Sequence, residues 1–324
     1  TKAAFDGVLK QLRDAGVGSG EMAAWLARLD IEPVFTAHPT EAVRRSLLEK
    51  EQAMVRALAA DIDGDRTPLE RAGDWGAVRM ALTAGWQTAE HSNVRPAVAD
   101  EIEHVGFYLM DVLYRVVPVF YETLEAALAE TYGHAVAVPP LLRFASWVGG
   151  DMDGNPNVGA DTVTESLATQ RAAVMERHGA ELGRLGRLLS QTLGCVAVDH
   201  AVIDRAEAYR SLQPEAAARL RPRHAGMPYR VLLYLLRARV QAAARGHAGG
   251  YANAAELSAD LALISASLRA NRGEHAGLFR VRRLERRVQT FGFHLARLDV
   301  RQHAGGHARD VAQALGDNDW AARD

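Results

Sequence analysis

Residues 34–41 read VFTAHPTE, and this stretch decides the fold that we predict for the chain. Val34 to Ala37 are apolar or β-branched, which is typical of a short buried strand. Pro39 has no N–H to donate to a neighbouring strand, so His38 is predicted to lie at the carboxyl end of the strand. A helix is predicted to follow at once, with Thr40 as its cap, Glu41 in its first turn and an apolar stripe that continues to Ala60.

A strand that ends on a titratable residue and leads directly into a helix is typical of β/α barrels, which place catalytic groups at the carboxyl ends of their strands. His38 is therefore a catalytic candidate. The alternative is a hydrogen-bonded structural histidine, and this stretch alone leaves both interpretations open.

The composition excludes several classes of protein. Lys and Arg number 38 against 40 Asp and Glu, a net charge of -2, which argues against a dominant nucleic-acid or membrane-surface role. The single cysteine, Cys195, excludes an internal disulfide and lies in an apolar run that predicts a buried thiol. No apolar segment is long enough to span a bilayer and no signal peptide is recognisable, so we expect a cytoplasmic protein.

Most of the remaining chain is predicted to be helical, because apolar residues recur every three to four positions. The predicted helical segments are 1–30 (interrupted at 16–20), 74–90, 98–128, 161–193, 229–245, 256–270 and 281–289. Pro118 is expected to kink the longest of them. The last one is strongly basic, with five arginines between Arg280 and Arg287, and is predicted to be a solvated helix face rather than a nucleic-acid site.

A second strand is predicted at 141–148, followed by a tight loop that reads GGDMDGNPN at 149–157. Asp151, Asp153 and Asn155 alternate as calcium ligands do. The chain lacks the glycine and glutamate that an EF-hand requires at later positions, so the calcium interpretation fails. These side chains either cap backbone N–H groups in the turn or form part of a site.

A third strand is predicted at 290–302, where the apolar pattern changes to a period of two. Phe293 and Leu295 would share one face with Arg297, Asp299 and Arg301. That face changes from apolar to charged toward its carboxyl end, as an inward-facing barrel strand does.

These three stretches, in this order, closely resemble the signatures of phosphoenolpyruvate carboxylase. FTAHPTE with the following Arg44–Arg45 pair resembles the first histidine signature of the family, and SW before GGDMDGNPNV resembles its glycine-rich segment. The stretch from Phe291 to Gln302 resembles its Phe-Gly-x-x-x-x-Arg-x-Asp-x-Arg-Gln motif. One departure is Met152, where the family usually has arginine.

The resemblance implies that bicarbonate and phosphoenolpyruvate react with Mg²⁺ or Mn²⁺ to give oxaloacetate and phosphate, a reaction that replenishes the tricarboxylic acid cycle. His38 would accept the proton of a carboxyphosphate intermediate, and the metal would stabilise the enolate. Arg301 would hold the substrate, since a guanidinium grips oxyanions bidentately and stays charged. Water must be excluded, because protonation of the enolate would give pyruvate.

Other residues are supporting candidates: Arg44, Arg45, Asp151, Asp153, Asn155, Arg297, Asp299 and Gln302. Arg44 and Arg45 either bind an anion or are solvated surface charges. Resemblance to plant members suggests an activator site for phosphorylated sugars, but the partner arginines expected near Ser92 and Asn93 are absent. Arg297 is favoured over Arg301 as a structural ion-pair residue. His303 and His307 have a zinc-like spacing, but the Gly305–Gly306 pair between them is expected to remove the rigid helix that this spacing needs, which argues against metal.

We therefore predict a mainly α fold, the helix-rich N-terminal portion of a decorated β/α barrel with a few barrel strands. Residues 1–324 would form the N-terminal part of one large domain whose C-terminal half, with the metal ligands, is absent, and this fragment would be inactive alone. Family likeness implies a tetramer regulated by metabolites. The alternative is a non-catalytic helical binding protein that keeps an anion pocket around His38, Arg301 and the Asp151 loop.

Overall fold

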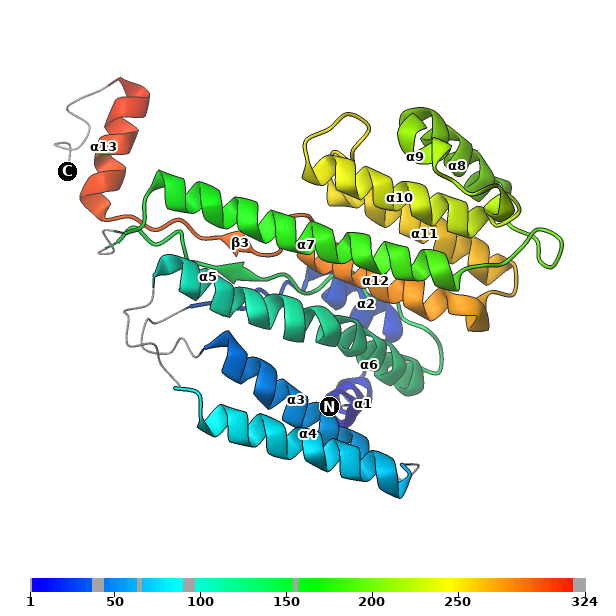
Figure 1. Ribbon diagram of the computed structural model, residues 1–324, viewed down its shortest axis with the longest axis horizontal. Coiled ribbons are helices and arrows are strands. Elements are labelled where there is room, and N and C mark those ends of the chain that lie inside the picture. The colour runs from blue at the N-terminus through cyan, green and yellow to red at the C-terminus, as the bar shows by residue number, and fades with distance from the viewer. Residues whose placement is uncertain (1, 37–43, 63–65, 90–96, 154–156, 317–324) are drawn as a thin grey trace. The chain divides into compact units, whose positions relative to one another are not determined.

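The computed structural model describes residues 2–36, 44–62, 66–89, 97–153 and 157–316 (Figure 1). These residues are mainly helical, with three short parallel strands, which confirms the predicted fold class and is consistent with part of a barrel domain. The chain divides into two compact units, which are described one at a time.

Unit 1 comprises residues 1–34, 109–145 and 167–297. Its helices are α1 (Lys2–Asp14), α2 (Ser19–Arg28), α6 (Tyr114–Tyr132), most of α7 (Ala160–Leu188), α8 (His200–Leu212), α9 (Pro214–Ala218), α10 (Pro228–Ala244), α11 (Ala254–Ala270) and α12 (Phe279–Phe291), with a 3-10 turn η2 (Pro222–His224) and a π turn η3 (Glu274–Leu278). Helices α1 and α12 pack against α6, α11 packs against α12, and α8 packs against α10. Leucines of α10 and α11 fill the core, and Leu232, Leu236, Leu257 and Leu261 are fully buried.

The long helical stretch that precedes the second strand is interrupted, but not at Pro118, where a kink is predicted. Helix α5 (Val98–Phe107) passes through a π-helical segment, η1 (Tyr108–Leu113), into α6. Pro118 is buried inside α6, so the irregular backbone lies about one to three turns before the proline. Proline removes the N–H that would bond to the carbonyl four residues earlier, which loosens the ladder on that side.

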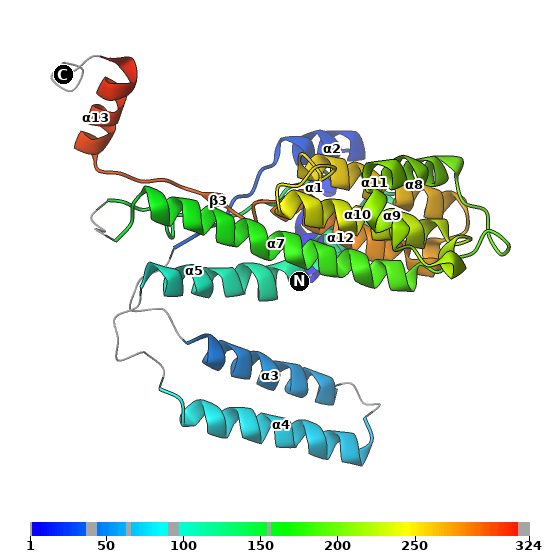
Figure 2. The same ribbon diagram turned by 45° about the horizontal axis from the view of Figure 1, so that its top comes forward.

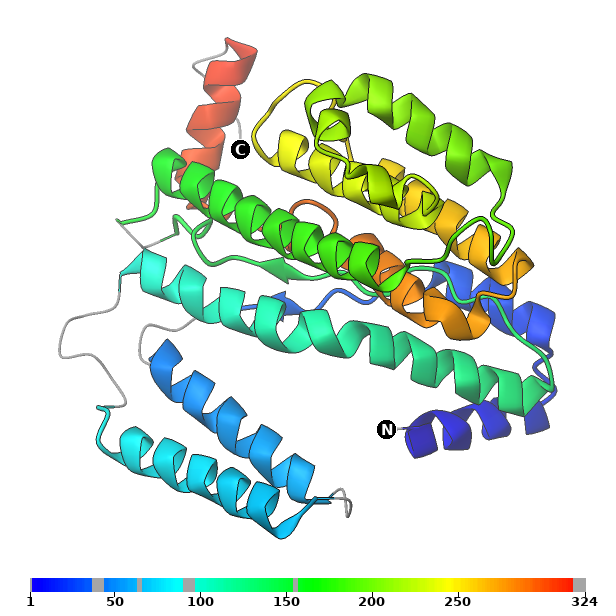
Figure 3. The same ribbon diagram turned by 45° about the vertical axis from the view of Figure 1, so that its right-hand side comes forward.

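Unit 2 comprises residues 35–108, 146–166 and 298–324. Its helices include α3 (Arg45–Ile62), α4 (Pro68–Trp86), α5 and α13 (Ala304–Leu315). Figures 2 and 3 both show α3 and α4 side by side. Helix α4 begins at Pro68, earlier than the predicted 74, because Thr67 and Glu70 form a capping box ahead of it.

The three strands are β1 (Val34–Phe35), β2 (Ala145–Ser146) and β3 (Arg297–Leu298), in the order β1-β2-β3. The first residue of each strand belongs to unit 1 and the second to unit 2. Within unit 1, the N–H of Ala145 donates to the carbonyl of Pro33 at 3.1 Å; within unit 2, the N–H of Asp299 donates to the carbonyl of Ser146 at 2.9 Å.

The predicted third strand is too long. Residues 292–296 form a turn, and extended backbone begins only at Arg297. Gly292 and Leu295 both have positive φ, 53° and 69°, so the chain cannot continue as a pleated strand there. Phe293 and Leu295 are buried in that turn, and the proposed common face with Arg301 is therefore wrong.

Candidate functional site

His38, the leading catalytic candidate, lies outside the described residues, as does Asn155. The structure describes the chain on either side of His38, up to Thr36 and again from Arg44. Phe35 ends β1 and accepts a bond from the N–H of Trp147 at 3.4 Å, within unit 2. Helix α3 begins at Arg45, and Arg44 precedes it, so α3 starts later than the predicted helix. Thr40 and Glu41, the predicted cap and first turn, lie outside the described residues.

The two arginines near the start of α3 are both exposed. The guanidinium of Arg45 pairs with Glu49 at 3.0 Å and with Glu103 at 3.4 Å. Arg44 precedes the helix, and its carbonyl accepts the N–H of Leu47 at 2.8 Å. Arg45 is therefore a solvated surface charge with acidic partners, which fits the simpler of the two interpretations.

The loop after β2 is a tight turn whose geometry demands glycine. Gly149 has φ +80°, and a Cβ there would lie 2.1 Å from the hydroxyl of Ser166. At Gly150 a Cβ would lie 2.6 Å from the carbonyl of Asp299, so the loop and the chain after β3 are in direct backbone contact. The carboxylate of Asp151 accepts the N–H of Asp153 at 3.1 Å, which is the capping role that the turn interpretation predicts.

Arg301 is held against this loop from two sides. Its N–H donates to the carbonyl of Gly150 at 2.9 Å, and its carbonyl accepts the N–H of Met152 at 2.7 Å, the bonds of a parallel bridge. Its guanidinium carbon lies 3.9 Å from the centroid of the Trp147 ring. The sequence alone did not reveal this stacking, although Trp147 directly precedes the glycine loop.

The stacking leaves Arg301 chemically free to bind an anion. The residue is exposed, and no carboxylate of the described residues pairs with its guanidinium. An arginine stacked on an indole offers its face to the ring and keeps its in-plane N–H donors for a planar oxyanion. The arrangement is thus suited to phosphate or carboxylate.

The other charged candidates near β3 have different surroundings. In unit 1, the guanidinium of Arg297 lies 3.5 Å from Glu32, which also pairs with Arg143 at 3.2 Å. Arg297 is thus an ion-pair residue, as predicted. In unit 2, Asp299 is exposed, and the amide of Gln302 lies against Gly306, where a Cβ would be 2.6 Å from its nitrogen.

The described residues contain no group of three His, Cys, Asp or Glu side chains that could hold a metal ion. His303 instead caps α13, since its ring nitrogen accepts the N–H of Gly305 at 3.2 Å. The expectation that the glycine pair would prevent a helix there is wrong, because both glycines lie in the first turn of α13.

The basic helix α12 is not simply a solvated face, so that prediction is wrong in part. Arg283 makes a bidentate pair with Glu122 at 2.6 and 2.7 Å, and both Arg282 and Arg286 bind Glu125 on α6. The sequence could not show this, because the acidic partners lie about 160 residues earlier.

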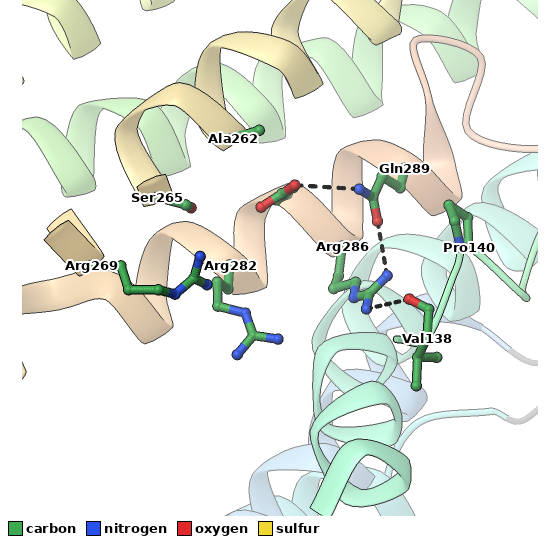
Figure 4. Close-up of a pocket in the computed structure, with 9 residues that line it drawn as sticks. Val138, Pro140, Ala262, Ser265, Arg269, Arg282, Arg286 and Gln289 are labelled. Carbon is green, nitrogen blue, oxygen red and sulfur yellow. Dashed lines mark hydrogen bonds between the residues drawn. The ribbon is translucent and has the colours of Figure 1, made fainter. Parts of the chain in front are cut away.

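A cavity of about 320 Å³ opens between α11, α12 and the segment after α6 (Figure 4). Figure 4 shows the guanidinium of Arg286 between Val138, whose carbonyl it reaches at 2.8 Å, and Gln289 at 3.1 Å. Glu285 lines the same cavity, and burial raises the pKa of its carboxyl group. Arg282 and Arg286 in this cavity already pair with Glu125, so their charge is compensated, which does not favour anion binding.

Cys195 is exposed, so the predicted burial of its thiol is wrong. The residues around it form a turn after α7, and the N–H of Cys195 bonds to the carbonyl of Thr192 at 2.9 Å. An apolar run in a short turn cannot turn all of its side chains inward.

Two buried polar clusters in unit 1 have structural roles. His178 is fully buried, with one ring nitrogen 2.9 Å from the hydroxyl of Tyr114 and the other 2.9 Å from the carbonyl of Gly292. Asp260, also fully buried, accepts bonds from the hydroxyls of Tyr209 at 2.8 Å and Tyr251 at 2.6 Å. Both of those bonds go to Oδ2, and Arg205 donates to Oδ1, so each carboxylate oxygen has a donor, as a buried charge requires.

Comparison with known proteins agrees with the sequence motifs. A sequence model of phosphoenolpyruvate carboxylase matches residues 1–321. The phosphoenolpyruvate carboxylase of Xanthomonas campestris pv. campestris (strain 8004) is 60% identical over 316 residues, which cover 98% of this chain and 35% of that protein.

More distant relatives give the same result. The phosphoenolpyruvate carboxylase of Roseiflexus castenholzii is 35% identical over 95% of this chain and 34% of its own length. That of Burkholderia mallei (strain SAVP1) is 33% identical over 95% of this chain and 32% of its own length. The chain therefore spans about a third of the length of the curated relatives it matches. None of the helices in the described residues is long and apolar enough to cross a bilayer.

Proposed function

Because the chain belongs to the phosphoenolpyruvate carboxylase family, we propose that the protein containing it carboxylates phosphoenolpyruvate with bicarbonate, giving oxaloacetate and phosphate. The observation that carries the proposal is Arg301, stacked on Trp147 beside the glycine loop with its in-plane donors open to solvent. We further infer that residues 1–324 are the N-terminal part of one large domain.

Arg301 binds the substrate in this proposal. Phosphoenolpyruvate carries a phosphate and a carboxylate, and a guanidinium fits either with two parallel hydrogen bonds. The indole of Trp147 fixes the plane of the guanidinium, and the backbone bonds to Gly150 and Met152 fix its position along the strand. A pre-positioned arginine loses little side-chain freedom when the anion arrives.

His38 is the proposed general base. Bicarbonate attacks the phosphorus, the phosphorus–oxygen bond to the enol carbon skeleton breaks, and carboxyphosphate and an enolate result. The imidazole takes the proton of the carboxyphosphate, which then separates into carbon dioxide and phosphate, and the enolate carbon attacks the carbon dioxide. A neutral imidazole suits this task near neutral pH.

The metal has no assigned ligands here. The described residues do not make up a site for Mg²⁺ or Mn²⁺, so we infer that the family's metal ligands lie in the two thirds of the relatives that this chain does not span. For the same reason the 324 residues alone are proposed to lack carboxylase activity. Tetrameric assembly, metabolite regulation and a cytoplasmic location are proposed from family likeness.

The test uses the natural full-length protein and measures oxaloacetate formation. Arg301→Gln is expected to lower kcat/KM for phosphoenolpyruvate by about 100-fold, mainly through KM, because the oxyanion loses a charged bidentate partner. Arg309→Gln is the matched control, since Arg309 is exposed on α13 in the same unit, and it should change kcat/KM less than about twofold.

His38→Asn separates catalysis from binding. This variant is expected to bind phosphoenolpyruvate with nearly the wild-type affinity but to form no oxaloacetate. If the wild-type full-length protein binds phosphoenolpyruvate yet releases no phosphate with bicarbonate and Mg²⁺, the carboxylase proposal is refuted in favour of a binding protein.

A further inference from the structure

A second cavity, of about 350 Å³, lies wholly within unit 1 and is lined by α7, the segment after α9, and α10. Figure 1 shows these helices in green and yellow. Five arginines line it: Arg187 from α7, Arg219 and Arg221 from the segment, and Arg230 and Arg237 from α10. We call this cavity the arginine pocket.

The positive charge of the arginine pocket is uncompensated. No Asp or Glu lines it, and none of its five arginines forms an ion pair with any of the described residues. Elsewhere in unit 1 arginines have acidic partners: Arg282 and Arg286 bind Glu125, and Arg205 binds Asp260. Since the whole chain has a net charge of -2, this cluster is a local exception.

Arg237, one of the five arginines, has an unmet hydrogen bond. Its Nε is buried and has no acceptor among the described residues. The opposite wall is Gly183, where a Cβ would lie 3.2 Å from the Nη1 of Arg237, so a larger residue would crowd the guanidinium. A buried donor without an acceptor costs free energy, which a bound oxyanion would offset.

Two other side chains, His224 and Tyr234, also line the arginine pocket. Burial, and then the charges of Arg230, Arg223 and Arg221, lower the pKa of His224 at the rim. Tyr234 also lines the pocket and is 36% exposed, so its ring is available to a flat ligand. The pocket thus offers positive charge on several sides and one aromatic surface.

We propose that the arginine pocket binds an anion that carries a diphosphate group. Arginine is the side chain best matched to phosphate, since it donates two parallel hydrogen bonds to adjacent oxygens. Pyrophosphate has six terminal oxygens, against the four oxygens of inorganic phosphate, and a higher charge, so it can engage more of the five guanidiniums at once. The cavity is also larger than one phosphate requires and lies at the small end of the range for ligand pockets, roughly 300–1,000 Å³.

The proposal is independent of the carboxylation reaction, and its test is a binding measurement. Isothermal titration calorimetry is performed on the natural full-length protein with pyrophosphate, inorganic phosphate and ADP at constant ionic strength. Pyrophosphate is expected to bind at least about tenfold more tightly than phosphate, in proportion to the additional charge-assisted hydrogen bonds. Equal affinities, or no binding of pyrophosphate, would overturn the proposal and leave the carboxylase proposal intact.

The chain offers a closely matched pair of variants. Arg221 and Arg223 are both exposed and lie two residues apart, but only Arg221 lines the pocket. Arg221→Gln is expected to weaken pyrophosphate binding about tenfold, and Arg223→Gln less than about twofold, although both remove one positive charge. An equal effect of the two would indicate an adventitious ion held only by surface charge, which overturns the proposal.

The ADP arm identifies the source of the diphosphate. If ADP binds more tightly than pyrophosphate and Tyr234→Leu removes the difference, the ligand is a nucleotide whose base stacks on the ring. If ADP binds no more tightly than pyrophosphate, the pocket recognises the diphosphate group without a ring. Both results support the proposal.

Discussion

Protonation of His178 should destabilise unit 1 as the pH falls. Burial lowers the pKa of this imidazole from 6.5 to about 4. The hydrogen bond to the carbonyl of Gly292 opposes this shift, and the positive charge of Arg287 adds to it. A carbonyl can only accept, so the Nε2–H of His178 donates to Gly292 and the hydroxyl of Tyr114 donates to Nδ1. The neutral ring therefore has both nitrogens satisfied.

The lowered pKa of His178 determines how the free energy of unfolding changes with pH. Between pH 6.5 and pH 4 the unfolded chain binds a proton on this residue that the folded chain does not, so the free energy of unfolding falls as the pH falls. This stability is fully present above pH 6.5. The free energy of unfolding should fall by about 2 kcal/mol between pH 7.5 and pH 5, and by roughly 3 kcal/mol in total once the pH is well below 4.

The assay is urea-induced unfolding of the 324-residue chain at a series of pH values. His178→Gln lowers stability at pH 7.5 but should remove about 2 kcal/mol of the wild-type loss between pH 7.5 and pH 5. Leu185→Ala is the control: this buried residue of the same helix costs about 2–5 kcal/mol without removing a titrating group, so its pH dependence should match the wild type. If His178→Gln keeps the full wild-type pH dependence, the assignment of a buried neutral imidazole is refuted.

Two further predictions concern stability. Gly149→Ala should lower the free energy of unfolding by at least about 1–2 kcal/mol, because φ is +80° and the new methyl group would meet Ser166. Gly159→Ala, with open space around it, should change stability by less than about 0.5 kcal/mol in the same urea titration. Asp260→Asn should cost about 3–5 kcal/mol, because it removes a fully buried carboxylate that pairs with Arg205 and accepts hydrogen bonds from Tyr209 and Tyr251. Asp204→Asn, at an exposed position on α8, should be nearly neutral, and equal losses for the two aspartates would contradict this account.

The sequence predicted most of the helices because their apolar periodicity is local, but it missed α8 and α13. It also predicted the paired segments around β1 and β2, and the turn at Gly149, where glycine and aspartate are required by the backbone itself. The third strand was predicted too long because that prediction also used only a local pattern. An alternating pattern from Phe293 to Arg301 looks like a strand, and nothing local indicates that Leu295 adopts positive φ.

Long-range partners account for what the sequence did not reveal. The charge of α12 is compensated by Glu122 and Glu125, and the arginine pocket combines residues from 187 to 237, so neither could be recognised as a cluster in the chain. The candidate site was predicted from motifs, but the stacking of Arg301 on Trp147 depends on a parallel register that only the fold provides. The roles proposed for His38 and Asn155 stay predictions.

The bridge between Asp151 and Arg301 joins positions that are 150 residues apart, counted from one number to the other. During synthesis at roughly 5–20 residues per second, the glycine loop leaves the ribosome about 8–30 s before the strand that completes it. The helices α8 to α12 are made in that interval and can form their local contacts first. Arg301, which we propose binds the substrate, is thus among the last parts of this chain to be placed, and the helices α8 to α12 can form before its position against the glycine loop is fixed.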